Sequence, residues 1–406
     1  MSDEIDEPAP FSLRVACDTT IPQFLLKEVR GKLAYLDELV IGTEVSATGD
    51  AVTLLLRREV DAASRARLAA KTNGLVTSMA DGAFEPLNRV LEDFTDRPTP
   101  YGPDPTTILL DRGELFQEGP GFYALGPLMS RLIDFMERRF LVVAADMGAA
   151  PYRFPALLSP DYMERVKYFT NFPHSLSFVT HLREDLEVIS RFADEAACRG
   201  GGVVAPEDAY AAPPAMLSPT VCHHLYHALS DHTVPAGGLT ATAAGHCFRY
   251  ESSNMVSLER LWNFTMREII FVGSEDYVAD RLDDIRRRVQ PVFADMGLAY
   301  RVETATDPFF VDTHRDQSAY QNAYELKFEI LATLPFKNDC LAAGSYNRHR
   351  DFFGRTLAIT ADDGAPAHTG CVGFGFERLA FAFVAQHGPD PASWPAPVKD
   401  HLEAAS

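Results

Sequence analysis

Long apolar runs are missing from this sequence of 406 residues, and none approaches the roughly 18 residues that a membrane-spanning helix needs. The N-terminal segment MSDEIDEPAP has no basic residue and no apolar stretch, so it does not resemble a secretory signal. Cysteine is also scarce and scattered, at Cys17, Cys198, Cys222, Cys247, Cys340 and Cys371. We therefore expect a cytoplasmic protein whose cysteines are reduced thiols or metal ligands, without a disulfide framework.

The sequence has fewer basic than acidic residues. The 37 Lys and Arg residues face 57 Asp and Glu residues, a formal net charge of −20. A surface this negative repels a phosphate backbone, which disfavours bulk nucleic-acid binding but leaves room for a local basic patch. The share of hydrophobic residues, 46%, is ordinary for a globular protein, and the length allows one large core and a smaller domain.

The clearest interruption of the pattern is the segment RPTPYGPDP at 97–105, which we interpret as part of a linker over 96–106. Before it, strand-like and helix-like runs alternate, which predicts a small N-terminal α+β domain of unknown role over 1–95. After it we expect one larger domain over 107–395 and a C-terminal tail over 396–406. A Gly-, Pro- and Ala-rich segment at 199–215 is predicted to be an exposed loop.

Within the larger domain, apolar residues at four-residue spacing predict a helix within 126–148, and a similar pattern predicts another over 277–293. Ser218 and Pro219 are typical of a helix start. The segment 325–334 is predicted as a strand with Lys327 and Glu329 on one face. The segment 368–388 is predicted to begin as a strand and to become a helix after Phe376, with Arg378 in its first turn.

The segment 247–268 has the strongest chemical character. Its two alternating halves predict an antiparallel strand pair joined by the polar loop SSNMVS. A period of two places Cys247, Arg249 and Glu251 on one face of the first strand. It places Arg260, Trp262, Phe264, Met266 and Glu268 on one face of the second. Arginines, glutamates and aromatic rings together make a poor core, and they favour a nucleotide site.

These segments resemble known motifs. FRYE (248–251) and LERLWNFTMRE (258–268) resemble motif 2 of class II aminoacyl-tRNA synthetases, and GFGFER (373–378) resembles their motif 3. GPLMSRLIDFMERRF with PYRFPALLSP takes the place of motif 1. Cys222, Glu268 and Cys371 resemble the zinc ligands of methanogen-type seryl-tRNA synthetases and of their truncated relatives, the amino acid:[carrier protein] ligases. YFTNFPHSLSFVTHL, LSPTVCHHLY and GSYNRHRDFFG also resemble those ligases. The resemblance covers about 107–395, and it implies an α+β fold with an antiparallel sheet flanked by helices, and a homodimer.

The resemblance implies a role for each motif residue in forming an aminoacyl-adenylate. Negative charge builds up on the α-phosphate during this reaction, and arginine, which is always charged and bidentate, stabilises it. Arg249 would hold the α-phosphate and the substrate carboxylate, Arg378 the γ-phosphate, and Arg260 the phosphates. Phe264 would stack on adenine, and Glu251 would accept a hydrogen bond from its amino group. Mg²⁺ would accompany ATP, with Glu329 as a candidate ligand, although synthetases use another acidic residue where this chain has Leu341.

For zinc, the three ligands lie 46 and 103 positions apart, too far for a zinc finger. By resemblance, the α-amino group of the substrate would complete the shell of one zinc ion per subunit. Trp262, Met266 and Asn347 would line the pocket and favour glycine or alanine. A rival metal site would use His223, His224 and His227, for which surface or second-shell positions are the expectation. Taken without the family, Cys222 and Cys371 would be ordinary buried residues.

Three functions stay open. The first is transfer of the activated amino acid to the phosphopantetheine thiol of a carrier protein, with Arg281, Arg286, Arg287 and Arg288 as docking candidates and with neither tRNA nor membrane as partner. The second is tRNA aminoacylation of the seryl type. The third is a non-catalytic synthetase paralogue, which the retained arginines and zinc ligands disfavour.

Overall fold

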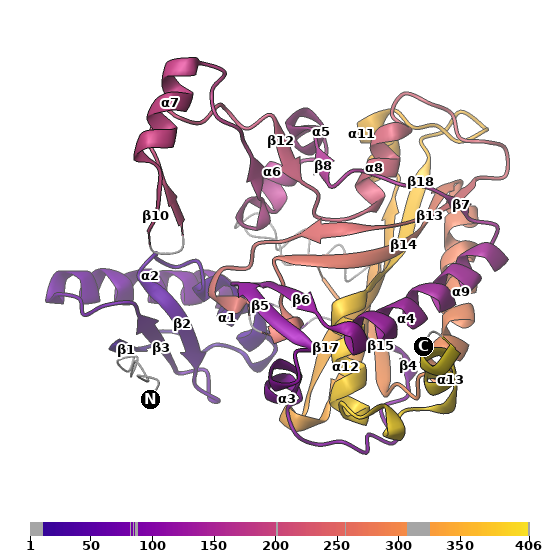
Figure 1. The fold of residues 1–406 in the computed structure, drawn as a ribbon, viewed down its shortest axis with the longest axis horizontal. Helices are drawn as coiled ribbons and strands as arrows, with labels where there is room; N and C mark the ends of the chain where they lie inside the picture. The colour runs from indigo at the N-terminus through magenta and orange to yellow at the C-terminus, as the bar shows by residue number, and fades with distance from the viewer. Residues whose placement is uncertain are drawn as a thin grey trace.

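The computed structural model describes residues 11–81, 83, 85, 88–199, 202–255, 257–306 and 325–404. Its N-terminal part is a small sheet of order β1-β3-β2, formed by β1 (Phe11–Ala16), β2 (Val40–Val45) and β3 (Ala51–Leu56). Helices α1 (Leu26–Leu33) and α2 (Ala62–Ala80) complete this unit (Figure 1). It has a separate core, which includes Val29, Leu33, Val52, Leu54, Leu68 and Val76. This unit therefore combines one antiparallel sheet with two helices.

The boundary of this N-terminal unit was predicted too late in the chain. Strand β4 (Val90–Asp93) pairs with β15 (Tyr300–Thr304), so it belongs to the large sheet. The buried carboxylate of Glu92 accepts hydrogen bonds from Tyr300 and Arg286, which fixes this strand at the sheet edge. The Pro-rich segment at 97–105 thus lies inside the larger unit, and α3 (Thr106–Asp111) starts directly after it.

The large sheet has eight strands in the order β4-β15-β16-β17-β18-β14-β13-β7. All neighbours are antiparallel except β13 and β7, which run parallel. Its central strands are β13 (Leu239–Phe248), β14 (Asn263–Gly273), β16 (Lys327–Leu334), β17 (Asp339–Arg350) and β18 (His368–Gly375), with β7 (Ala150–Pro151) at the far edge. This arrangement confirms the predicted α+β class.

One face of the sheet is covered by α4 (Pro127–Asp146), α9 (Glu275–Asp295) and α12 (Phe376–His387) (Figure 1). Phe140 of α4 stacks on Phe374 of β18, with ring centroids 4.0 Å apart. Residues 396–406 were predicted as a tail, which is wrong for the described part. Helix α13 (Ala396–Ala404) packs against α4 and buries Val398.

The opposite face carries a second core, to which α5 (Pro160–Arg165), α8 (Cys222–Ala228) and α11 (Phe352–Leu357) contribute. Successive side chains of β18 point to opposite faces of the sheet. A Cβ at Gly370 would lie 2.8 Å from Val278 of α9, whereas the next residue, Cys371, belongs to the second core. Cys371 therefore points away from α9.

The two strands of the motif 2-like segment are displaced from their predicted positions. Strand β13 ends at Phe248 and β14 begins at Asn263, so Arg249, Glu251, Arg260 and Trp262 lie in the connection between them. This connection contains the short 3-10 turns Ser252–Asn254 and Ser257–Glu259, and both of their first serines have positive φ. Polar and apolar residues alternate beyond the ends of both strands, and this alternation is why a longer hairpin was predicted.

Helix α8 begins at Cys222, with Val221 as its N-cap, rather than at the predicted Ser218-Pro219. The predictions of α4, α9, β16 and the β18–α12 unit are confirmed by the observed elements. The described residues contain no helix that is long and apolar enough to cross a membrane.

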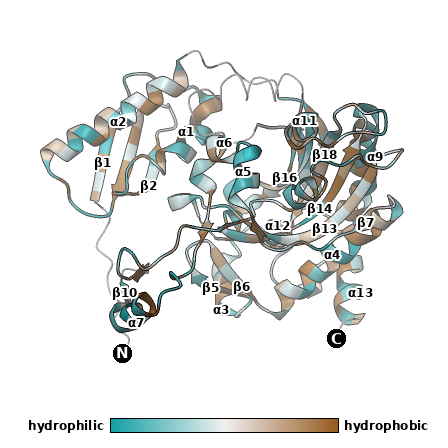
Figure 2. Cartoon of the chain, turned by 90° about the horizontal axis from the view of Figure 1, so that it is seen from above, coloured by the Kyte–Doolittle hydropathy of each residue, from teal (hydrophilic) through white to brown (hydrophobic). Residues whose placement is uncertain are grey.

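Smaller elements complete the fold. A hairpin of β5 (Leu115–Gly119) and β6 (Phe122–Leu125) precedes α4. Helix α6 (Tyr168–Asn171) follows α5. A small sheet is formed by β8 (Leu157–Leu158), β12 (Ala215–Leu217) and β9 (Phe178–Val179). An arm of α7 (Leu186–Glu195), β10 (Ala197–Arg199) and β11 (Gly202–Val204) projects from the body in both ribbon views (Figures 1 and 2). The predicted loop at 199–215 therefore contains part of a hairpin.

Candidate active site

Three side chains that are far apart in the sequence meet on the face of the sheet opposite α9. Cys222 is the first residue of α8, Glu268 lies on β14 and Cys371 on β18. One ligand atom from each lies within 4.8 Å of the others, and all three residues are buried. Strands β14 and β18 are neighbours in the sheet, and Glu268 pairs with Gly373 while Ile270 pairs with Cys371. This register brings the side chains of Glu268 and Cys371 close together.

The Glu268 carboxylate is held by several donors from the chain before α8. Thr220 Oγ1 donates to Glu268 Oε1 over 2.5 Å, and the backbone N–H of Val221 donates to the same oxygen over 3.1 Å. The N–H of Cys222 donates to Oε2 over 2.8 Å. Asn347 Nδ2 lies 3.6 Å from Cys371 Sγ. These contacts hold the carboxylate and one thiol in place before any metal binds. Asn347 was predicted as a pocket residue, whereas Thr220 has no signal in the sequence beyond its position two residues before Cys222.

The electrostatics of this cluster favour a cation. Burial, followed by the nearby Cys371, raises the pKa of Glu268 to about 7. Burial also raises the pKa of Cys222 well above its usual value, whereas hydrogen bonds from Cys222 and, more weakly, from His349 lower the pKa of Cys371 to about 5. Three buried acidic groups this close would repel one another if all were ionised, and a divalent cation removes that cost.

The residues fit a zinc ion by their donor chemistry. Zinc prefers thiolates with nitrogen or carboxylate ligands, and tetrahedral Zn–S bonds of about 2.3 Å place the ligand atoms roughly 3.8 Å apart. The observed spread within 4.8 Å matches that scale. Three ligands from the protein leave one position for another molecule.

A second group, of three arginines, surrounds Phe264 and Glu251. The Arg249 guanidinium carbon lies 5.4 Å from the centroid of the Phe264 ring, and that of Arg378 lies 6.0 Å from it. Arg260 donates to Glu251 over 2.6 Å, and Arg378 approaches the same carboxylate at 3.9 Å. Burial lowers the pKa of Arg378, and the positive charges of Arg249 and Arg260 lower it further. Arg260 and Arg378 share one carboxylate and Arg249 lies beside the same ring, which leaves positive charge that a polyanion would neutralise.

The two groups share one face of β14. Phe264 and Glu268 are four residues apart on a strand with unbroken register, so their side chains point to the same side about 13 Å apart. Met266 lies between them, and a Cβ at Gly373 would come within 2.5 Å of its terminal carbon. The glycine therefore leaves room for the Met266 side chain on this face.

Trp262 and Glu329 have partners of their own. Trp262 Nε1 donates to Ser177 Oγ over 2.8 Å, and its ring meets that of Tyr250 edge-on at 5.0 Å. Glu329 forms an ion pair with Lys327 at 3.1 Å, as expected for two residues on one face of β16. Another carboxylate, missed in the sequence, is Glu377, which accepts the backbone N–H of Thr265 with both oxygens.

The three histidines of α8 do not form the rival metal site among the described residues. His223 contacts the rings of Tyr162 and Phe353, and His224 stacks on Phe154 with centroids 5.4 Å apart. His223 and His224 are buried, which excludes the surface alternative for them, whereas His227 is exposed as that alternative expects. His227 meets the ring of Tyr162 at 4.7 Å. All three histidine rings therefore pack against aromatic rings.

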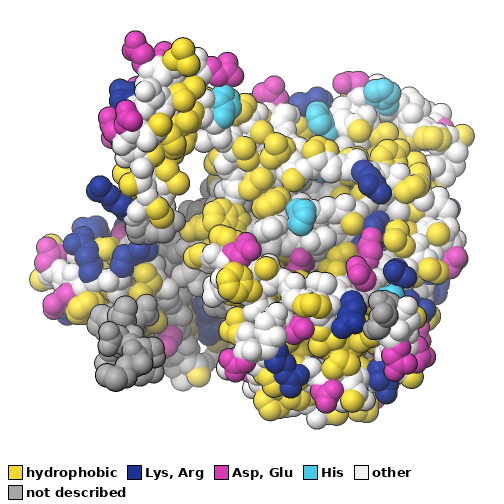
Figure 3. All heavy atoms as spheres, in the orientation of Figure 1, with side chains coloured by type: hydrophobic (Ala, Val, Ile, Leu, Met, Phe, Trp, Pro, Cys, Tyr) yellow, Lys and Arg dark blue, Asp and Glu magenta, His cyan; other side chains and the backbone are white. Residues whose placement is uncertain are grey.

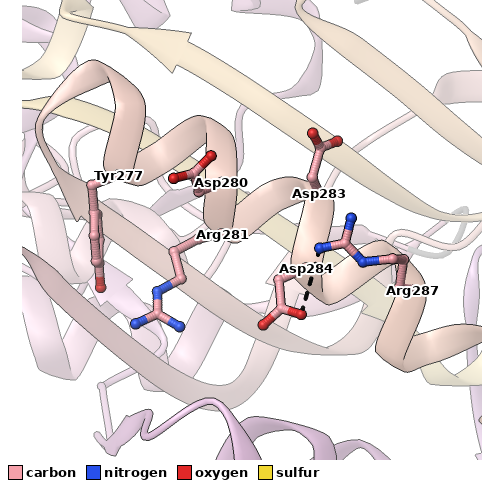
Figure 4. Close-up of a pocket in the computed structure, with 6 residues that line it drawn as sticks. All are labelled: Tyr277, Asp280, Arg281, Asp283, Asp284 and Arg287. Carbon is pink, nitrogen blue, oxygen red and sulfur yellow. Dashed lines mark ion pairs between the residues drawn. The ribbon is translucent and has the colours of Figure 1, made fainter.

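The four docking candidates lie on α9, behind the sheet as seen from the Cys222–Glu268–Cys371 cluster. A hollow of about 420 Å³ on the outer side of this helix is lined by Tyr277, Asp280, Arg281, Asp283, Asp284 and Arg287 (Figure 4). Arg288 binds Asp284 over 2.8 Å, and Arg286 binds Glu92 at the sheet edge. Docking through Arg281, Arg287 and Arg288 stays a prediction, while Arg286 is engaged within the fold.

Comparisons with known proteins agree with this arrangement. Residues 213–387 match the family described as the tRNA synthetase class II core domain (G, H, P, S and T). Amino acid–[acyl-carrier-protein] ligase 1 of Bradyrhizobium diazoefficiens is 35% identical over 304 residues, which cover 74% of this chain and 90% of the relative. Ligase 2 of the same organism is 37% identical over 328 residues, which cover 79% and 94%.

Among solved structures, M. kandleri SerRS in complex with A. aeolicus tRNASec superposes with a TM-score of 0.70 at 20% identity. The superposition covers 98% of this chain and 78% of that protein. The sheet and the matched core give this protein the fold of the class II synthetases. Given the identity to the two Bradyrhizobium proteins over most of their length, the chain belongs to the family of amino acid–[acyl-carrier-protein] ligases.

Proposed function

We propose that this protein activates a small amino acid, glycine or alanine, with ATP and transfers it to the phosphopantetheine thiol of a carrier protein. The observation that carries the proposal is the placement of two sites on one face of β14, an arginine–phenylalanine site at Phe264 and a thiol–carboxylate site at Glu268. An aminoacyl-adenylate has adenine at one end and an amino group at the other, so it needs these two sites along one line.

At the first end, Phe264 stacks on adenine and Arg378 covers the other face of the base. In the reaction, a carboxylate oxygen of the amino acid attacks the α-phosphorus of ATP, and the bond to pyrophosphate breaks. Arg249 and Arg260 stabilise the charge that develops on the phosphate oxygens, because their guanidinium groups are already in place. Mg²⁺ bound to ATP would share this charge.

At the second end, Cys222, Glu268 and Cys371 would hold a zinc ion. A bound zinc ion would supply a Lewis-acidic position for the α-amino group, so that only a free amine is accepted. Met266 narrows the space beside Glu268, which favours a small side chain. In the second half-reaction the carrier thiol attacks the activated carbonyl, AMP leaves with the bonding electrons, and a thioester forms.

The test is ATP–pyrophosphate exchange with each amino acid in turn, followed by incubation with a phosphopantetheinylated carrier protein. Exchange with glycine or alanine and a thioester on the carrier are expected. Total tRNA serves as the alternative acceptor. Charging of tRNA without loading of any carrier would reassign the second half-reaction, and an absence of exchange with every amino acid would overturn the activation step itself.

A further inference from the structure

The N-terminal unit contacts the large unit at the loop that carries Glu251. Tyr35, which follows α1, donates its hydroxyl hydrogen to the carbonyl oxygen of Tyr250 over 3.0 Å. Ser252 Oγ donates to the carbonyl oxygen of Ala34 over 3.2 Å, and Asn254 Nδ2 donates to that of Gly31 over 3.1 Å. Helix α1 lies on the side of its unit that is nearest to the large sheet (Figure 1).

The same loop is held from its other side. The backbone N–H of Tyr250 donates to the carbonyl oxygen of Ser175 over 3.1 Å, and the Tyr250 ring packs edge-on against Trp262. The ring of Tyr35 meets the ring of His174 at 5.2 Å, next to Ser175 in the chain. The loop is therefore sandwiched between α1 and the 3-10 turn Pro173–Ser175.

This loop has a conformation that its surroundings must maintain. Ser252 has φ +52°, in the left-handed region that a non-glycine residue adopts at an energetic cost. The residue before it, Glu251, binds Arg260 and lies near Arg378. A shift of the loop would therefore move the carboxylate and disturb two of the three arginines around Phe264.

We infer that the N-terminal unit positions Glu251 for nucleotide binding, and that Tyr35 is the positioning residue that transmits this effect through the loop. The inference rests on the proposed function, in which Glu251 accepts a hydrogen bond from adenine. Burial and the nearby Glu251 raise the pKa of Tyr35, so its hydroxyl remains protonated and able to donate. Tyr35 itself touches the loop and not the nucleotide.

The experiment compares Tyr35→Phe and Asn254→Ala with the wild-type protein. Tyr35→Phe keeps the ring against His174 and removes only the hydroxyl. Gln23→Ala is the matched control, because it removes a hydrogen bond of 2.8 Å to Ala47 inside the N-terminal unit. In pyrophosphate exchange, both loop variants are expected to raise the KM for ATP about three- to tenfold, the effect of one hydrogen bond. The KM for the amino acid and the Tm should stay within error of wild type.

A direct binding measurement separates this inference from the proposed function. Calorimetric titration with ATP gives a Kd that does not depend on catalysis, and it is expected to rise by the same factor in both loop variants. If wild type binds ATP but exchanges no pyrophosphate, the proposed function fails and the Kd values still decide the inference. Unchanged ATP binding in Tyr35→Phe and Asn254→Ala would overturn the inference alone. Equal losses for ATP and amino acid with a lowered Tm would also overturn it, by showing a general structural role.

Discussion

Cys371 is the residue on which the metal prediction can be tested most cleanly. It is buried on β18, within 4.8 Å of the other two ligand atoms, and its lowered pKa favours the thiolate that zinc binds. Cys371→Ser should reduce the zinc content of the purified protein from about one ion per subunit to background, as measured by atomic absorption. Cys340→Ser is the control, because Cys340 lies outside the cluster on β17 and contacts Arg301. Equal zinc in both variants would show that the cluster is not the zinc site.

Thr220 offers a finer test of the same site, because it touches a ligand without being one. Its hydroxyl donates to Glu268 Oε1, so Thr220→Val keeps the shape and removes one of the donors that orient the carboxylate. Loss of such an outer contact typically costs about 10- to 100-fold in metal affinity. Competition with a fluorescent chelator measures this affinity. A Kd for zinc equal to that of wild type would refute the role given to Thr220.

Arg378 tests the nucleotide end. A lysine at this position keeps the charge but loses the planar group that lies near both Phe264 and Glu251. Arg378→Lys should lower kcat/KM for ATP by about 100-fold in pyrophosphate exchange, the scale of one lost transition-state donor. Arg287→Lys, on the exposed side of α9, should leave it unchanged. A loss of similar size in both variants would contradict the assignment.

At the scale of elements, the contact between the turn Pro173–Ser175 and Tyr35 is expected to depend on pH. Burial lowers the pKa of His174 to about 4, against an ordinary value of 6.5. The unfolded chain therefore binds more protons than the folded one between those values, and stability falls as the pH drops from about 6.5 to 4. The neighbouring charges are Glu251, which opposes the shift, and Lys32, which adds to it.

Thermal unfolding across this pH range measures the effect. The wild-type midpoint should fall more steeply below pH 6.5 than that of His174→Gln, which cannot gain a proton there. Other buried histidines, such as His387, titrate in both proteins and cancel in the comparison. Parallel curves for the two proteins would mean that His174 is not buried in its neutral form.

The elements also show how far sequence patterns reach. Helices α4 and α9 were predictable because each buries one apolar stripe along its whole length. The ends of β13 and β14 were not, because Arg249, Glu251, Arg260 and Trp262 alternate in a connecting loop, where they form hydrogen bonds and an ion pair instead of pairing as strands. Strand β4 was missed for a related reason, since its partner, β15, follows about two hundred residues later.

For the whole molecule, the cluster of Cys222, Glu268 and Cys371 was predictable and the residues that support it were not. The resemblance pointed to these three residues as one group, and the structure brings them together. Thr220 and Tyr35 carry no such signal, because a threonine beside a helix and a tyrosine in a small domain are common. Only the fold brings Tyr35 to the carbonyl of Tyr250, across 215 positions of the chain.

The expected homodimer is a prediction about the whole molecule. Helix α4, the motif 1 analogue, exposes 59% of Val142 and 39% of Leu141, although its other face is packed in the core. The projecting arm also exposes apolar side chains, above all Leu186, and Figure 3 shows hydrophobic atoms gathered along it. Exposed apolar patches of this kind mark interaction surfaces, and most homo-oligomers are two-fold dimers.

We place the dimer interface on α4 and expect Val142→Glu to convert the protein to monomers, because it buries a charge in a self-complementary contact. Sedimentation velocity at micromolar concentration should show a dimer for wild type and a monomer of unchanged Tm for the variant. Leu110→Glu is the control, since Leu110 on α3 is 43% exposed but lies outside α4. A wild-type monomer would refute the dimer. A dimer that persists in Val142→Glu but dissociates in Leu186→Glu would move the interface from α4 to the arm.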